Sequence, residues 1–242
     1  MTEQSAPPKL EYEAPTGRKC PVRDDLAYVL PMLVFLGFVW LGSNWSKDHP
    51  WTYVAAYVAR AIVVAGLLIW LWPCYTKVRW NHWWLGLIVG VIGIFQWVGM
   101  QLFLQQHHEH FRPGPDFFNP ETHFQTPAGF WSFVAIRIIG AVLVVPVMEE
   151  LFWRDYLWRQ ILAPSDFKLA AVGEWNWTPF LLVAGAFALV HGNWWLTSIV
   201  WGLMVGALLV YTKSIGACII AHAITNLLLA FYVLWKKDWA FW

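Results

Sequence analysis

The chain has 242 residues, of which 59% are hydrophobic and only 13% are charged. An ordinary soluble domain is about half apolar and about a quarter charged, so this composition excludes a typical soluble protein and favours the lipid bilayer as solvent. The formal charge of +1 gives no large basic surface, which argues against nucleic acid as a partner. Twenty tryptophans fit the same class, because indole rings favour the membrane interface.

Residues 1–25 are polar and precede the first apolar stretch. Four prolines and four Lys or Arg residues in this segment predict a short disordered tail. The apolar stretch that follows is of full length and has further ones behind it, so we interpret it as a retained span rather than a cleaved signal peptide. Cys20, Cys74 and Cys218 are odd in number and lack CxxC spacing, so neither a disulfide framework nor a zinc ribbon is predicted.

Stretches of about 20 mostly apolar residues, the length that crosses a bilayer, follow one another through residues 26–242. They lie at 26–43, 51–72, 83–104, 130–150, 179–193, 195–211 and 214–235. We therefore predict an all-α, polytopic transmembrane bundle of about seven helices in a single domain. The stretches at 179–193 and 195–211 are short, and a different division of this region gives eight.

Lys and Arg in short connections favour the cytoplasmic side of a membrane. They concentrate in the tail and in the second and fourth connections, which predicts a cytoplasmic N-terminus. Lys236 and Lys237 follow an odd number of helices and run against this assignment. The longest connection, 105–129, carries four histidines and is interpreted as a solvated loop in preference to a metal-binding one.

Charged residues at bilayer depth are costly and invite a functional explanation. Arg60 and Arg137 lie inside predicted helices, where a structural pairing is favoured over a catalytic role. Glu149 and Glu150 are the only carboxylates inside the predicted helices. Arg154 stands one helical turn after Glu150, so we predict an ion pair that keeps Glu150 ionised. Glu149 projects about 100° round the helix and is left for chemistry.

Two histidines also lie in apolar segments, His191 after Phe187 to Val190 and His222 one helical turn before Asn226. A carboxylate and an imidazole can together deprotonate a water molecule. A second imidazole and a carboxamide can donate hydrogen bonds to an oxyanion. No GxSxG pattern is present, so activated water is preferred over a side-chain nucleophile. These residues predict a hydrolytic site inside the bundle.

Three sequence patterns then carry a family resemblance. The EExxxR pattern of residues 149–154, the FxxxH pattern of residues 187–191 and the HxxxN pattern of residues 222–226 occur in this order. Together they resemble the motifs of the CAAX-prenyl-protease and bacteriocin-processing family of intramembrane proteases, also called the Abi family. The resemblance covers roughly residues 130–230, which would hold the catalytic core.

The resemblance implies a role for each motif residue. Glu149, assisted by His191, would activate the attacking water, and His222 with Asn226 would form the oxyanion site. The supporting residues would be Glu150, Arg154 and Phe187. It further implies a glutamate-dependent endopeptidase without a metal, with zinc held by Glu149, His191 and His222 as the alternative.

The same resemblance implies the setting of the protein. The substrate would be a membrane-anchored peptide or protein, and the membrane the inner membrane of a bacterium. The sequence around Glu149 also looks similar to the subgroup found beside exosortase systems, which implies partners from such a pathway.

Two other functions remain compatible with the residues. One is a non-proteolytic scaffold, immunity or chaperone protein of the same fold. The other is a proton-coupled transporter, because Glu and His also form proton relays in membranes. The absence of an apparent internal repeat argues against the transporter.

The predicted depths of the site residues pose a geometric problem. Glu149 lies about 28 Å along a helix that starts at Phe130, whereas His191 lies about 18 Å into its own helix. The two converge only if the helices depart from ideal lengths or directions. Pro146 predicts a kink just before the acids, because it removes a backbone hydrogen bond.

Overall fold

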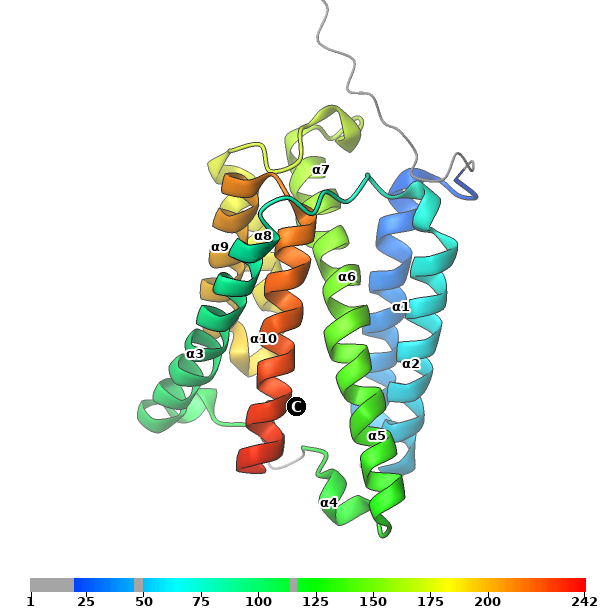
Figure 1. Ribbon diagram of the computed structural model, residues 1–242, viewed down its shortest axis with the longest axis vertical. Coiled ribbons are helices and arrows are strands. Elements are labelled where there is room, and N and C mark those ends of the chain that lie inside the picture. The colour runs from blue at the N-terminus through cyan, green and yellow to red at the C-terminus, as the bar shows by residue number, and fades with distance from the viewer. Residues whose placement is uncertain (1–19, 46–49, 114–116) are drawn as a thin grey trace, which may run out of the picture.

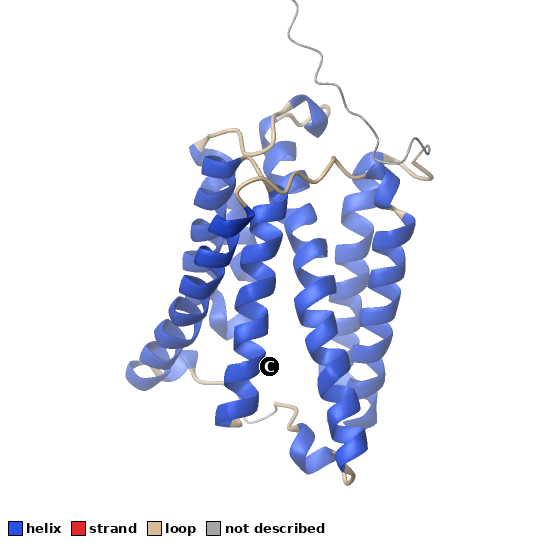
Figure 2. Cartoon of the chain, in the orientation of Figure 1, coloured by secondary structure: helices blue, strands red, loops and turns tan. Residues whose placement is uncertain are grey.

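The computed structural model describes residues 20–45, 50–113 and 117–242, and all regular structure in these ranges is helical (Figure 2). Residues 1–19 of the predicted tail lie outside the described ranges. The separate long helices are α1 (Asp24–Trp45), α2 (Pro50–Trp70), α3 (Trp83–His107), α9 (Trp195–Thr212) and α10 (Ile215–Lys236). A further helical stretch runs without a break from Pro127 to Leu162.

Within the described ranges, six helical stretches are long and apolar enough to cross a membrane. The shorter apolar helix α8 (Trp177–Leu189) is a seventh pass through the bundle, and only the 3₁₀ turn Gly192–Trp194 separates it from α9. The predicted all-α transmembrane bundle is confirmed, and most helices begin and end within a few residues of the predicted bounds. The exception is the stretch predicted at 130–150, which continues to Leu162. The chain is therefore a multi-pass membrane protein.

The helices form two groups that meet along α6 and α10 (Figure 1). One group contains α1, α2 and the 127–162 stretch, and the other contains α3, α8, α9 and α10. Small residues allow α3 and α10 to pack closely, as is common between membrane helices. A Cβ on Gly90 would stand 2.7 Å from Ile224 Cβ, and Thr225 Oγ1 donates to the Gly90 carbonyl at 2.9 Å.

The 127–162 stretch changes its winding twice. It begins as α5 (Pro127–Ile139), passes through a π-helical turn at Gly140–Val144, and continues as α6 (Val145–Glu150). A second π-helical segment, Leu151–Leu157, leads into α7 (Trp158–Leu162). Such π segments are rare and occur frequently at functional sites. Here they flank the two acidic residues on both sides.

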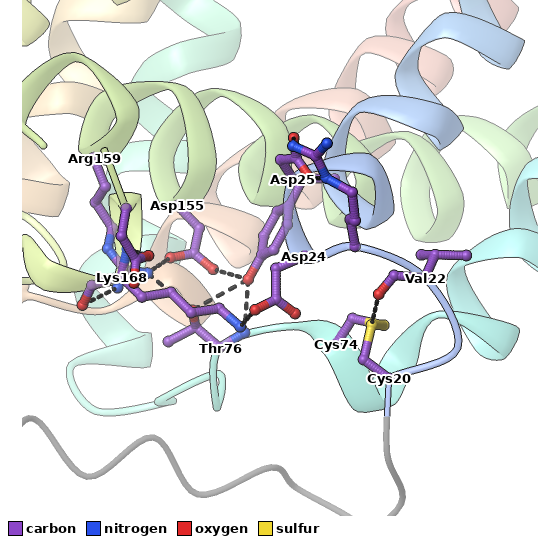
Figure 3. A network of polar contacts seen from close by, with 12 residues as sticks. Cys20, Val22, Asp24, Asp25, Cys74, Thr76, Asp155, Arg159 and Lys168 are labelled. Atoms are coloured by element: carbon purple, nitrogen blue, oxygen red, sulfur yellow. Dashed lines mark hydrogen bonds and ion pairs between the residues drawn. A yellow bond between two sulfur atoms is a disulfide. The ribbon is translucent and has the colours of Figure 1, made fainter. Parts of the chain in front are cut away.

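A buried polar network fixes the end of the bundle at which α1 begins (Figure 3). Tyr28 donates to Asp155 Oδ2 at 2.8 Å, and Arg159 Nη1 donates to Asp155 Oδ1 at 2.6 Å. The same Arg159 nitrogen donates to Thr76 Oγ1 at 2.9 Å. Arg159 is therefore a buried structural residue and not a solvated cation of the fourth connection.

Two of the three cysteines are bonded at this end of the bundle, which corrects the sequence-based prediction. Cys20 and Cys74 form a disulfide between the segment that enters α1 and the turn that follows α2. Their separation of 54 residues resembles no short motif, so spacing gave no signal for the pairing. Cys218 is free and buried.

Candidate active site

Glu150 is the centre of a buried charged cluster. Its side chain is fully buried, and its Oε1 atom lies 3.2 Å from Arg154 Nη1. The spacing of four residues predicts this ion pair. The same oxygen lies 2.8 Å from His222 Nδ1, which projects from α10. Glu150 thus joins the 127–162 stretch to α10, and it orients the His222 ring so that Nε2 is the nitrogen left for a ligand.

Glu149 is also buried, with 6% of its surface exposed. In the described part of the chain its Oε2 atom has no hydrogen-bond partner. The charges of His222, Glu150, Arg154 and Arg60 all act on this carboxylate. A buried carboxylate without a partner is costly, so this group is held ready for a ligand or for chemistry.

His191 stands just beyond the end of α8, where the chain turns towards α9. Its Nδ1 atom lies 2.7 Å from the Phe187 carbonyl oxygen, one helical turn earlier. A carbonyl only accepts, so Nδ1 carries the proton and Nε2 is left as a basic nitrogen. The ring packs 4.3 Å from Phe187 and 5.7 Å from Trp97, measured between centroids. These contacts fix the direction of the imidazole.

Phe187 connects His191 to the acid pair. Its ring lies 4.9 Å from the Arg154 guanidinium carbon, which is within cation–π range, and the arginine itself holds Glu150. The charges of His222 and Arg154 act on the His191 ring. The three motif segments therefore converge in space, with His191 linked to Arg154 through the Phe187 ring.

Asn226 makes an unexpected contact. Its Nδ2 atom donates to the Ala141 carbonyl oxygen at 2.8 Å. In the first π turn Val145 N–H bonds to the Gly140 carbonyl, so the next bond in the ladder would run from residue 146 to Ala141. Residue 146 is proline and has no N–H. Asn226 supplies the missing donor, as neighbouring side chains do where proline interrupts a membrane helix.

In the described ranges no hydrogen bond or ion pair joins the remaining sequence candidates, Arg60 and Arg137, to this cluster. The Arg60 guanidinium stacks between the rings of Phe35 and Tyr57, at 4.6 and 4.4 Å. Arg137 lies over the Tyr57 and Trp242 rings. Within the described ranges neither arginine forms an ion pair with a carboxylate, so aromatic faces take the place of the acidic partner that was considered for each.

The zinc alternative requires the side chains of Glu149, His191 and His222 to converge on one point. Among the residues that the structure describes, no group of three or more His, Cys, Asp or Glu side chains is arranged to hold a metal ion. The same holds for the histidine-rich connection. Nδ1 of His222 contacts Glu150 and leaves Nε2 free, as in many metal-bound histidines, so the metal-free site stays a prediction.

Sequence reasoning missed two features next to the site. The Asp155–Arg159 pair was detectable, because its four-residue spacing repeats that of Glu150 and Arg154. The link from Asn226 to Ala141 was not, because it depends on a change of helical winding. Nothing in the amino-acid pattern marks that change except the proline itself.

The chain thus forms a helical bundle of membrane-spanning length with buried acids, imidazoles and an amide close together. Residues 130–228 match the family model described as type II CAAX prenyl endopeptidase Rce1-like. This region of the chain is therefore similar to that family of membrane proteases. No curated protein and no solved structure matches the chain.

Proposed function

We propose that this protein is an intramembrane endopeptidase that hydrolyses a peptide bond by means of a water molecule activated by Glu149 and His191. The observation that carries the proposal is the convergence of three motif segments on one buried cluster, centred on the contacts of Glu150 with Arg154 and His222. The family match of residues 130–228 supports the same class of reaction.

In the proposed reaction Glu149 accepts a proton from water while the water oxygen bonds to the carbonyl carbon. Nε2 of His191 accepts the second water hydrogen in a hydrogen bond and orients the water. The carbonyl π pair moves to oxygen and forms the oxyanion. When the intermediate collapses, the C–N bond breaks, and the leaving nitrogen takes the proton from Glu149. The carboxylate is thereby regenerated, and both peptide fragments are released.

His222 and Asn226 stabilise the oxyanion in this proposal. Glu150 stabilises an imidazolium form of His222, which can then donate from Nε2. Asn226 has one further N–H beyond the bond it gives to Ala141. Arg154 pairs with Glu150 at 3.2 Å and offsets the cost of burying this carboxylate. The donors are thus in place before the charge develops.

We further propose that the substrate is a membrane-anchored peptide or protein, because the site lies inside a bundle surrounded by lipid. The setting proposed is the inner membrane of a bacterium, with the N-terminus in the cytoplasm. An exosortase-type pathway is the proposed source of partners. No metal takes part in the proposed mechanism.

The test compares purified wild type with Glu149→Ala and His191→Ala on a panel of membrane-anchored peptides. We expect both variants to lose at least about 10²-fold in kcat, the usual contribution of general-base catalysis. Glu109→Ala is the matched control, because that carboxylate is 88% exposed and far along the chain from the motifs. Equal cleavage by wild type and both site variants would remove the assigned roles.

Two further measurements separate the alternatives. If Glu149→Gln fully restores the phenotype of a deletion strain, a scaffold role replaces catalysis. If purified, active protein holds stoichiometric zinc and loses activity with chelators, the metal-free mechanism is wrong. Proton-dependent uptake of a solute in liposomes would favour the transporter.

A further inference from the structure

Buried polar atoms without a partner gather at one place in this protein. In the described part of the chain nine buried side-chain nitrogen or oxygen atoms lack a hydrogen-bond partner, and five of them belong to residues 149–154. Two are the carboxylate oxygens of Glu149 and Glu150. The other three are donors: Nε and Nη2 of Arg154, and Nε1 of Trp153. Each buried donor without a partner costs about 1–3 kcal/mol, so this cluster is built to receive an acceptor.

Trp153 is the member of this cluster without an assigned role. Its side chain is 4% exposed, although an indole N–H normally finds a partner when it is buried. By contrast, the nearby Trp158 is 1% exposed and its Nε1 donates to the Glu174 carbonyl oxygen at 2.9 Å. The two tryptophans lie on the same helical stretch and differ in whether the structure provides an acceptor.

Helical spacing places Trp153 near Glu149, the proposed general base. It follows Glu149 by four residues across the junction of α6 with the π-helical segment Leu151–Leu157, a separation of about one helical turn. Its ring also packs against Phe187 at 5.9 Å between centroids in an edge-to-face arrangement. Phe187 in turn contacts His191 at 4.3 Å. The indole therefore packs against Phe187, the residue that contacts both His191 and Arg154.

We propose that the indole N–H of Trp153 is a further catalytic group, which donates a hydrogen bond to the oxyanion of the peptide bond under attack. This inference rests on the proposed function. When the water oxygen bonds to the carbonyl carbon and its proton passes to Glu149, the π pair of the carbonyl becomes the lone pair that accepts from Nε1. The donor is released when the C–N bond breaks and the carbonyl forms again.

The other two donors proposed for the oxyanion, His222 and Asn226, are partly engaged by other groups. Nδ1 of His222 faces Glu150, and one N–H of Asn226 is given to Ala141. The neutral N–H of Trp153 adds a donor in place of those that already bond to Glu150 and Ala141. Because Trp153 cannot lose its N–H proton at ordinary pH, its contribution needs no change of protonation state, unlike that of His222.

The test replaces Trp153 by Phe and, separately, by benzothienylalanine, in which sulfur stands where the N–H was. The second variant keeps the ring size and shape, so it separates the hydrogen bond from packing. We expect kcat to fall by on the order of 10²-fold in both variants, with KM changed less than about two-fold, since one oxyanion donor is lost. Trp158→Phe is the matched control and should lower the thermal midpoint without changing kcat.

The outcomes are distinct. Unchanged kcat in the benzothienylalanine variant overturns the inference, and so does a raised KM at constant kcat, because the group would then bind ground state and transition state equally. Glu149→Gln is measured in parallel. If that variant still cleaves, the proposed function fails. If it is inactive while both Trp153 variants keep full kcat, only the inference about Trp153 fails.

Discussion

Replacing Asn226 by Ala removes the side-chain N–H that reaches the Ala141 carbonyl oxygen at 2.8 Å. The carbonyl then lies in a membrane helix with no donor, because Pro146 cannot supply one. An unpaired group of this kind costs about 1–3 kcal/mol, and lipid offers no water as a substitute. We expect Asn226→Ala to destabilise the protein by this amount.

A second substitution should repair the first. Pro146→Ala introduces a backbone N–H at the position in the π turn that faces the Ala141 carbonyl. In the double variant the carbonyl is paired again, so we expect a coupling energy of about 1–2 kcal/mol between the two sites. Unfolding of the four proteins of this cycle in mixed detergent micelles, followed by tryptophan fluorescence, measures the coupling.

The same four proteins separate positioning from catalysis. If Asn226 also donates to the oxyanion, the double variant regains stability while kcat stays low. If Asn226 acts only by holding the helix, kcat recovers together with stability. A single variant Asn226→Ala that unfolds like wild type, or a double variant no more stable than the single one, would refute the account of the missing proline donor.

Two further predictions concern the end of the bundle at which α1 begins. Asp155→Ala leaves the buried guanidinium of Arg159 without its carboxylate and should destabilise the protein by about 3–5 kcal/mol. Asp155→Leu combined with Arg159→Met removes both charges and should cost much less. Unfolding midpoints measure both variants, and equal losses of stability would contradict the pairing argument. The Cys20–Cys74 bond closes a separation of 54 residues and should contribute at most about 4 kcal/mol to the free energy of unfolding. Reduction should lower the unfolding midpoint of wild type and leave that of Cys20→Ser unchanged.

The fold was predictable because lipid imposes a simple rule on sequence. Each membrane helix needs a long apolar run, and the runs at 83–104 and 214–235 correspond closely to α3 and α10. The short α8 was also predicted as short. The disulfide was not predicted, because its partners come together only when α1 and α2 pack side by side.

The sequence predicted the segments that the structure brings together, but it did not predict the contacts between them. The i, i+4 spacing of Glu150 and Arg154 reports a real neighbour relation, since it lies within one helix. The contact of His222 with Glu150 joins helices 72 residues apart in sequence, and no local pattern encodes it. The predicted Pro146 kink depends likewise on context: the π turn beside the proline changes the winding, and α10 supplies the lost hydrogen bond.

The disulfide and the polar network lie at the same end of the bundle, so the side of the membrane that this end faces affects both. Connections at the end that holds Cys20 and Cys74 carry Lys77, Arg79 and Lys213, which favours the cytoplasm for this end. A cytoplasm keeps thiols reduced, so the proposed orientation implies a pair that is open in the cell and closes on exposure to oxidant. The end of the bundle must then hold without it. The network of Figure 3 meets this requirement, because Asp155 binds both α1 and α7 through hydrogen bonds that do not depend on redox state.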